Sequence, residues 1–437
     1  MTRPVRRIAA VGTALLLTVA VLVGCARVTP SNQTKGVTIT VALAGPPPGK
    51  AALANFTRQT GVKVRWVQLD WDSLQTKISA AATSKTFFAD ATDVDWSRVG
   101  EFNVTGWFYP MNNYVDTKSF AHDMPQLSSF VVGKKVIGIP YDTSFLVTTV
   151  NKKLFKKAGI STTPTTIAEY TADLRKVKAS GVAHPLNIPF SAAEGLSTYW
   201  YEVTNAFGGQ VLNKDYQPQF TTPDSPGYQA MKWMVDALKQ GLVPPGNIDV
   251  TDGEGEQTLM AKGLVASTFG DYSGTVGTLY DDPSASSVPK QVTYIRTPGV
   301  KAPAGNVNNP DGIGIPRTAK YPKAAAEFIK WFIAPENQAN FAGLHGPSQA
   351  ISGFAFPARL TALKKLDENG KLPQGKQVID LLTKGSHPAF PGAQPPWYSQ
   401  FSNSVYTNIH SAAVGQESVD QAVGAIAETV KRLRGEA

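Results

Sequence analysis

Strand-like and helix-like segments alternate along the chain from Val37 onward, and this order constrains the fold more than any other feature. Three runs of β-branched or alternating apolar residues are separated by two segments with helical spacing, in chain order 37–44, 50–61, 62–69, 71–84 and 89–96. This order predicts an α/β fold with a mostly parallel sheet and helices on both faces. The length of 437 residues, with 42% hydrophobic residues, allows two or three domains of ordinary size.

The rest of the chain continues the pattern. Four further segments predict amphipathic helices: 164–181 beginning at a proline, 227–242, 321–343 interrupted at Pro335, and 418–435. Between the two halves, the stretch 132–160 contains two strand-like runs separated by the sequence PYDTSF, Pro140 to Phe145. We expect these two strands to be buried, and the mixed aromatic and polar residues between them to face a functional site.

A secretory signal is predicted at residues 1–24. Arg3, Arg6 and Arg7 form a basic head, and the uncharged run Ile8–Val23 is shorter than the ~20 apolar residues of a membrane-spanning helix. The arginine pair leaves export by the general or the twin-arginine route open.

The signal ends in LVGC, Leu22 to Cys25, which resembles the lipobox of bacterial lipoproteins. In that motif the cysteine is lipidated and becomes the mature N-terminus, so we expect a lipid anchor at Cys25 and a lipidated tether over 25–36. The chain would then lie on the outer face of the cytoplasmic membrane. Cys25 is also the only cysteine, which excludes an intrachain disulfide and a cysteine zinc site.

Several other chemistries are disfavoured by spacing. The segment Ala44–Ala51, AGPPPGKA, imitates a phosphate loop, but its glycines are one residue too close and its three prolines lack the N–H groups that hold phosphate. Two groups of acids do not match calcium-loop spacing: Asp90, Asp93 and Asp95, and Asp249, Asp252, Glu254 and Glu256. The five histidines are scattered, there is no G-x-S-x-G motif, and the net charge of +9 is dispersed. We therefore expect no metal, no cofactor and no nucleic-acid partner.

Aromatic residues recur beside short polar residues near the ends of predicted strands. The clusters are Asp95–Trp96, Tyr141–Asp142 with Phe145, Tyr199–Trp200–Tyr201, Asp271–Tyr272, Asn309 with Asp311, and Trp397–Tyr398. Ligands of open α/β sheets sit outside the carboxyl ends of the strands. An aromatic face can pack on a sugar ring while carboxylates and amides bond its hydroxyls, so the clusters indicate a polar, ring-shaped ligand.

Four segments resemble extracellular solute-binding proteins of carbohydrate ABC transporters, the family 1 or maltose-binding-protein-like group. They are GKKVIGIPYDTSFLVTTVNKKLFKKAGI, TPTTIAEYTADLRKVKASG, LMAKGLVASTFGDYSG and GIGIPRTAKYPKAAAEFIKWFIAPENQANF. The resemblance extends from Val37 to the C-terminus, and with the lipobox it suggests a bacterial lipoprotein of actinobacterial origin. Thr149-Val150-Asn151 departs from the usual Tyr-Tyr-Asn, and Tyr272 stands where the family often has tryptophan.

The resemblance implies a two-lobed periplasmic-binding-protein-like fold with a multi-crossing hinge and a ligand in the cleft. We expect 37–144 with 292–341 in lobe 1 and 145–291 with 342–437 in lobe 2, with crossings near 143–147, 292 and 341–346. The ligand-binding residues that it implies are Asp95, Trp96, Asp142, Ser144, Trp200, Asp271, Tyr272, Asp311, Gln349 and Trp397. Tyr141 is added to this set, with a place in the hinge core as its alternative role.

The function implied is that of a monomeric, lipid-anchored binding protein, not an enzyme. It would close around a mono-, di- or amino-sugar and deliver it to the permease subunits of an importer. Three alternatives remain at this stage: the same fold binding a glycerophosphodiester or peptide, a secreted lipoprotein glycosidase, and a purely structural surface lipoprotein.

Overall fold

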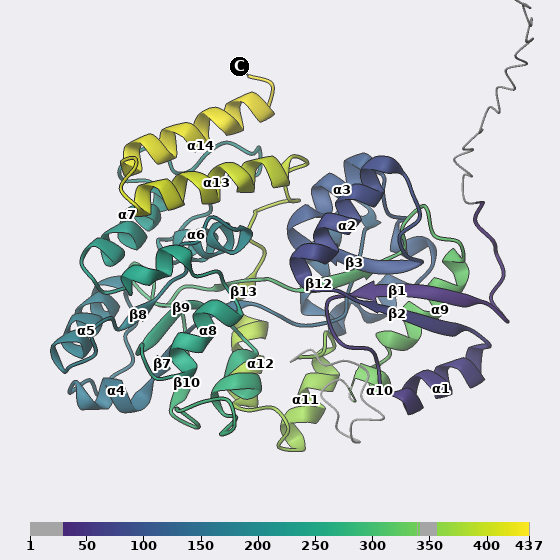
Figure 1. Cartoon of the computed structure of the whole chain (residues 1–437), viewed down its shortest axis with the longest axis horizontal. Helices are drawn as coiled ribbons and strands as arrows, with labels where there is room; N and C mark the ends of the chain where they lie inside the picture. Colours follow the sequence, from purple (N-terminus) through teal and green to yellow (C-terminus); the bar gives the residue numbers. More distant parts are fainter. Residues whose placement is uncertain (1–28, 339, 341–355, 437) are drawn as a thin grey trace, which may run out of the picture.

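The computed structural model describes residues 29–338, 340 and 356–436. Two lobes lie side by side, each with its own β-sheet (Figure 1). The signal segment, Cys25, the crossing expected at 341–346 and Gln349 lie outside the described residues.

The first lobe is built on a five-stranded sheet of order β2-β1-β3-β12-β6. Its strands are β1 (Thr38–Leu43), β2 (Lys63–Gln68), β3 (Ala91–Asp95), β6 (Ile139–Pro140) and β12 (Asp311–Gly314). Its helices are α1 (Lys50–Thr60), α2 (Trp71–Ser84), α3 (Val99–Thr105), α9 (Pro322–Phe332) and α10 (Pro335–Gln338). Between α3 and β6 the chain forms short 3-10 turns, Trp96–Arg98 preceding α3 and then Met111–Asn113, Thr117–Asp123 and Pro125–Phe130, and a small hairpin of β4 (Val131–Val132) and β5 (Lys135–Val136).

The second lobe contains a four-stranded sheet of order β10-β7-β9-β8. Its strands are β7 (Leu146–Asn151), β8 (Leu186–Asn187), β9 (Ser267–Tyr272) and β10 (Val292–Ile295). Its helices are α4 (Lys152–Lys157), α5 (Ile167–Ala179), α6 (Glu194–Ala206), α7 (Pro226–Lys239), α8 (Glu254–Ala261), α11 (Leu360–Glu368), α12 (Gly375–Gly385), α13 (Tyr398–Ala413) and α14 (Val419–Leu433). A 3-10 turn, Pro245–Asp249, and a π-helical turn, Val276–Tyr280, complete the lobe.

Local sequence explains the helix boundaries. Asp70 caps α2 by accepting a bond from the N–H of Ser73, and α1 ends at Gly61 with φ of 74°, as its sequence predicts. Helix α5 begins later than the proline start that we expected, because Thr166 and Glu169 form a capping box.

The prediction of a mostly parallel sheet is only partly correct. β1 runs parallel to β2 and β3, but β12 is antiparallel to both β3 and β6, and only β8–β9 is parallel in the second sheet. The physical reason is the crossing between lobes: β3 runs toward the other lobe, whereas β12 enters from it, so the two strands point in opposite directions.

Three stretches of chain meet between the lobes. The first joins β6 to β7 through residues 141–145, so the two buried runs flanking PYDTSF belong to different sheets. The second contains β11 (Asn306–Val307), which pairs with β13 (Ser386–His387). The third is the chain around Pro357, which follows the first lobe. An isolated bridge joins Phe145 of the first stretch to Asn308 of the second, and another joins Asp142 of the first to Pro357 of the third.

The lobe boundary expected at residue 292 is wrong. Val292 lies opposite Asn151 in the antiparallel β10–β7 pair, so this strand belongs to the second sheet. The chain joins the first sheet only at β12. A short apolar strand carries no local signal of which sheet it will join, because either sheet buries it equally well.

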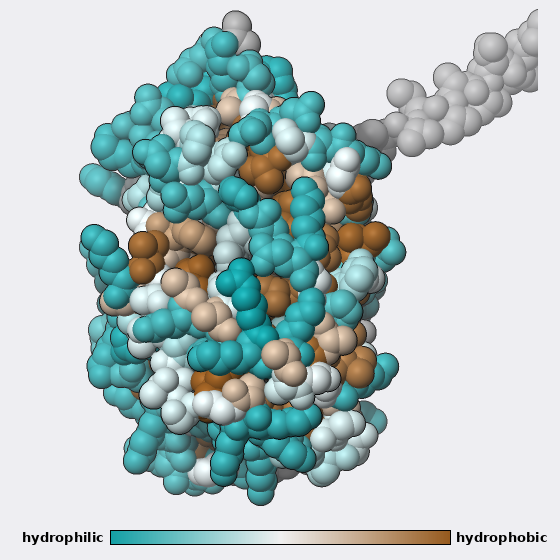
Figure 2. Space-filling model, turned by 90° about the vertical axis from the view of Figure 1, so that its left-hand side faces the viewer, coloured by the Kyte–Doolittle hydropathy of each residue, from teal (hydrophilic) through white to brown (hydrophobic). Residues whose placement is uncertain are grey.

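Strands β3 and β7 are buried along their whole length, and the buried hydrophobic residues that the structure describes form several separate clusters. Figure 2 shows the outer side of the second lobe, where hydrophobic side chains are interspersed with hydrophilic ones. Among the described residues, no helix combines the length and the apolar character needed to cross a membrane.

Candidate functional site

A cavity of about 420 Å³ lies between the two lobes. The first lobe and the crossing segments contribute Asp70, Trp71, Asp72, Asp95, Trp96, Ser97, Asp142, Ser144, Asn309 and Asp311. The second lobe contributes Ala193, Glu194, Gly195, Thr198, Thr251, Asp252, Gly253 and Tyr272. The volume falls within the range of small-molecule sites.

Three aspartates meet here because three neighbouring strands begin or end at the same edge of the first sheet. Asp95 is the last residue of β3 and lies opposite Asp311, the first residue of β12. Asp142 follows β6, which pairs with β12 on its other side. The sheet therefore positions carboxyl groups that lie far apart in the sequence, as the strand-end rule predicts.

Each of these aspartates is partly held by local hydrogen bonds. One oxygen of Asp95, Oδ1, accepts from the N–H and hydroxyl of Ser97, both at 2.8 Å. Asp142 Oδ1 accepts from the N–H of Asp311 at 2.7 Å, which ties the first crossing to the start of β12.

The protonation of this group is strongly perturbed. Burial raises the pKa of Asp142 to about 8, although the bond from the Asp311 N–H opposes the shift. Burial first, and then the neighbouring Asp142 and Asp95 charges, raise the pKa of Asp311 well above its usual range. Burial also raises the pKa of Asp95, against the bonds from Ser97. The cleft thus holds carboxyl groups that resist ionisation in the absence of a positive charge.

The opposite wall carries two more carboxyl groups with their own supports. Glu194, at the start of α6, accepts from the hydroxyls of Tyr398 and Ser402, and burial raises its pKa to about 8. Asp252 accepts from the hydroxyl of Tyr272, which is at the end of β9, and burial raises the Asp252 pKa as well. Both lobes therefore present acids and hydroxyls to the same cavity.

Two indole rings line the first-lobe wall. Trp96 is 4% exposed, and its N–H donates to the side-chain oxygen of Asn309. Trp71, in the first turn of α2, is half-buried and gives the cavity a larger aromatic surface. An aromatic ring held in this way can pack against the C–H face of a sugar.

Of the ligand-binding residues predicted from sequence, six line this cavity and four described ones do not. Asp95, Trp96, Asp142, Ser144, Tyr272 and Asp311 line it; Tyr141, Trp200, Asp271 and Trp397 lie elsewhere. Tyr141 is buried in the first lobe, where its hydroxyl donates to Asp93 at 3.0 Å. It supports the strand edge from behind.

The other three pack within the second lobe. Trp200 is fully buried on α6, and its N–H donates to the Gly227 carbonyl at 2.9 Å. Asp271 is buried and accepts from Thr149 at 2.7 Å. Trp397 packs edge-on against Tyr216, with ring centres 5.7 Å apart. Aromatic side chains in a helix or loop usually pack in the core. The sequence clusters do not distinguish such buried residues from residues that line a ligand site.

Several lining residues were missed. Asp70, Trp71 and Asp72 follow β2 directly, so the strand-end rule applied to them as well as to Asp95. Glu194 is the first residue of α6 and Asp252 lies in the loop before α8, and only the tertiary fold brings them to the cavity.

Asp90 belongs to one of the two groups of acids that do not match a calcium loop, and it has a structural role. Asp90 accepts from the backbone N–H groups of Thr40, Lys320 and Tyr321, so it joins three segments of the first lobe. No group of three or more metal-ligating side chains occurs in the described part of the chain.

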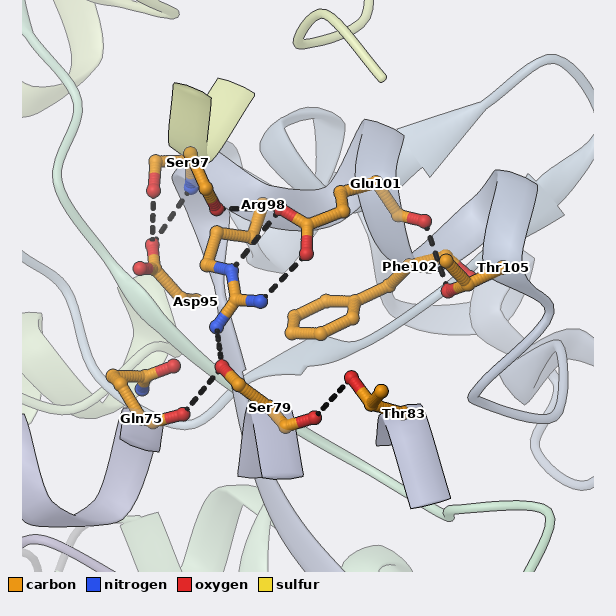
Figure 3. A network of polar contacts seen from close by, with 10 residues as sticks. Gln75, Ser79, Thr83, Asp95, Ser97, Arg98, Glu101, Phe102 and Thr105 are labelled. Carbon is orange, nitrogen blue, oxygen red and sulfur yellow. Dashed lines mark hydrogen bonds and ion pairs between the residues drawn. The ribbon is translucent and has the colours of Figure 1, made fainter. Parts of the chain in front are cut away.

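A polar network surrounds Arg98 in the first lobe (Figure 3). The guanidinium bonds Glu101 at 2.7 Å and Ser79 at 2.9 Å, while Asp95 is held by Ser97 instead. Glu101 also accepts from Ser399 of α13 at 2.6 Å, which is a contact between the two lobes.

Two sheets, a multi-stranded connection and a cavity lined from both lobes define a two-lobed binding protein. A family model of bacterial extracellular solute-binding proteins matches residues 44–339. The chain belongs to this family, whose members are exported binding proteins.

Individual relatives are distant. A Brucella abortus protein named as a binding protein is 27% identical over 212 residues, 47% of this chain and 49% of that protein, so the match spans about half of its length. The diacetylchitobiose binding protein DasA of Streptomyces coelicolor is 22% identical over 300 residues, 67% of each chain. The maltose-bound structure of T. maritima MalE3 has a TM-score of 0.75 at 19% identity, covering 91% of this chain and 100% of that one. The solved structure shows a shared fold.

Proposed function

We propose that the chain binds a carbohydrate between its lobes and delivers it to the permease subunits of an ABC importer. The observation that carries the proposal is a cavity lined by indole rings and by carboxyl and hydroxyl groups from both lobes. Family membership supports it, as do the sugars named for DasA and for MalE3.

The mechanism we propose is closure around the ligand. A sugar that contacts both walls favours the conformation in which the lobes are together, and a permease can then select the loaded form. Asp95, Trp96, Asp142, Ser144, Tyr272 and Asp311 are the proposed contacts from the sequence, and Trp71, Glu194 and Asp252 join them by their position.

We also propose that the chain catalyses no reaction. The family consists of binding proteins, and closure requires no covalent step. A chromogenic glycoside hydrolysed by the purified chain, with loss of turnover on replacing one cleft acid, would support the glycosidase alternative instead.

Its placement and assembly are proposed from sequence. A lipid on Cys25 would hold a monomer at the outer face of the cytoplasmic membrane through the 25–36 tether. Cys25→Ser should move the protein from the membrane fraction to the soluble exported fraction. Unchanged membrane retention would contradict the anchor.

The binding proposal is tested by titration calorimetry of the exported domain against neutral and amino mono- and disaccharides. Trp71→Ala should weaken binding about tenfold by removing a ring face, because aromatic packing contributes ~0.5–1.5 kcal/mol beyond the area that it buries. Trp233→Ala is the matched control: this ring is half-buried on α7, away from the cavity, and donates to Thr171. Saturable binding by no sugar of the panel would refute the proposal.

A further inference from the structure

The cavity is acidic without any compensating base. Seven of its eighteen lining residues carry a carboxyl group, and no lysine, arginine or histidine is among the described residues that line it. None of the seven forms an ion pair with another described residue. This arrangement repels anions and leaves the charge of the wall to be balanced by whatever binds.

Arg98, which follows Asp95 closely in the sequence, already has partners for its guanidinium group. The Arg98 guanidinium bonds Glu101 and Ser79 and lies 4.7 Å from the centre of the Phe102 ring (Figure 3). Its charge is therefore paired with Glu101, and Arg98 does not line the cavity. It lowers the pKa of Asp95, but less than burial raises it.

Two buried carboxyl groups keep an oxygen free at the cavity. Asp95 is 3% exposed and Asp142 is 8% exposed, and both line the cavity. Each uses Oδ1 for its hydrogen bonds, to Ser97 and to the Asp311 N–H, while Oδ2 has no hydrogen-bond partner in the described part of the chain. Neither atom is among the described side-chain oxygens that are fully buried without a partner, so each Oδ2 is open to the cavity, where a hydrogen-bond donor of the ligand can reach it.

The chemistry of that partner follows from the charges. A neutral hydroxyl can donate to such an oxygen but brings no positive charge to favour ionisation of the carboxyl group. An ammonium group donates charge-assisted hydrogen bonds and also lowers the cost of ionising the wall. The face of Trp71 is a further favourable contact for a cation.

We propose that the cleft selects a carbohydrate that carries a cationic amino group over its neutral counterpart. The inference rests on the proposed sugar-binding function and narrows its ligand class. Phosphorylated and uronic sugars are rejected by the same acids, because like charges placed together cost free energy.

Pairs of sugars that differ at the nitrogen substituent, a free cationic amine in one and a neutral acetylated amide in the other, test the inference. We would titrate the exported domain with glucosamine and N-acetylglucosamine, the galactosamine pair, and chitobiose with N,N′-diacetylchitobiose, at neutral pH and low salt. The free amine should bind about tenfold or more tightly in at least one pair, since charge-assisted bonds are roughly twice as strong as neutral ones. The preference should shrink as salt is added.

A variant identifies the source of the preference. Asp142→Asn keeps an oxygen for the Asp311 N–H but removes the ionisable group, so the ratio of amine to neutral affinity should fall several-fold in each pair, whatever the change in neutral affinity itself. Asp224→Asn, at an exposed site away from the cavity, is the matched control. Equal or tighter binding of the neutral partners in every pair would overturn the inference and leave the sugar-binding function standing. If no sugar of either kind binds, both fall.

Discussion

A close contact between the lobes, at Gly100, predicts that one added methyl group will hold the cleft open. Gly100 lies in α3 of the first lobe, and a Cβ built on it would stand 1.9 Å from the carbonyl oxygen of Gln394, in the loop that leads into α13. Ordinary contact begins at 3.4 Å, so Gly100→Ala requires the two segments to separate by about 1.5 Å. Rotation about the hinge can provide this separation, which places the cost on the closed form.

The magnitude follows from the cost of overpacking. An extra methyl in a filled contact costs ~1–3 kcal/mol. If that cost applies only to the closed form, the apparent affinity for ligand falls about 5- to 150-fold at 1.4 kcal/mol per tenfold. The Glu101–Ser399 bond beside it is lost in the same movement.

Calorimetry with the best-bound sugar measures the loss of affinity, and small-angle scattering measures the ligand-dependent decrease in radius of gyration, which should be smaller in the variant. The matched control is Gly424→Ala in α14, where an added Cβ meets no heavy atom within 4 Å. Wild-type affinity with wild-type compaction in Gly100→Ala would refute the reasoning. A large fall in the melting temperature of the unliganded variant would show that the contact stabilises the fold instead of the closed form.

Two further predictions concern buried groups outside the cleft. Burial raises the pKa of Glu202 from 4.5 to about 8, although its carboxyl accepts from the N–H of Val307 and the hydroxyl of Thr297. Its ionisation therefore destabilises the fold as pH rises, so the melting temperature of Glu202→Gln relative to the parent should rise between about pH 5 and about pH 9; a flat difference would contradict this. Trp200→Phe should cost ~1–3 kcal/mol of stability by removing the bond to the Gly227 carbonyl and part of the buried indole packing, while sugar affinity changes less than about twofold. A loss of sugar affinity without a loss of stability would indicate that Trp200 contacts the ligand.

Much of the first-lobe wall could be predicted from sequence because a strand end is a local feature. Asp95 and Asp142 each follow a short apolar run, and Asp311 precedes one, so their placement at a sheet edge depends only on those strands forming. The opposite wall depends on tertiary structure. Glu194 and Asp252 precede helices, where acids are common for reasons of helix stability alone, and nothing local indicates that these two face a cavity.

The aromatic residues illustrate the opposite error, in which a residue predicted to bind ligand is buried in the core. Trp200 sits in a helix between Tyr199 and Tyr201, and all three are buried. Nearly all residues of α6 are buried, polar ones included, so α6 is a core helix, and only its N-terminal part, at Glu194, Gly195 and Thr198, lines the cavity. The half-buried Trp71, preceded and followed by acids in a helix start, was the better candidate for a ligand platform.

The placement of Asp142 and Asp311 connects ligand charge to the hinge. Asp142 belongs to the first crossing and forms a bridge with Pro357 of the third, while Asp311 begins the strand that follows the second. The bond from the Asp311 N–H to Asp142 therefore joins crossing segments at the point where the lobes turn. A carboxyl group that is costly to ionise in the empty protein becomes a stable anion when a cationic ligand arrives, and an anion accepts that N–H bond more strongly than a neutral acid does. Binding of charge at this position would thus tighten the connection between the lobes, in addition to any contact that the ligand makes with the far wall.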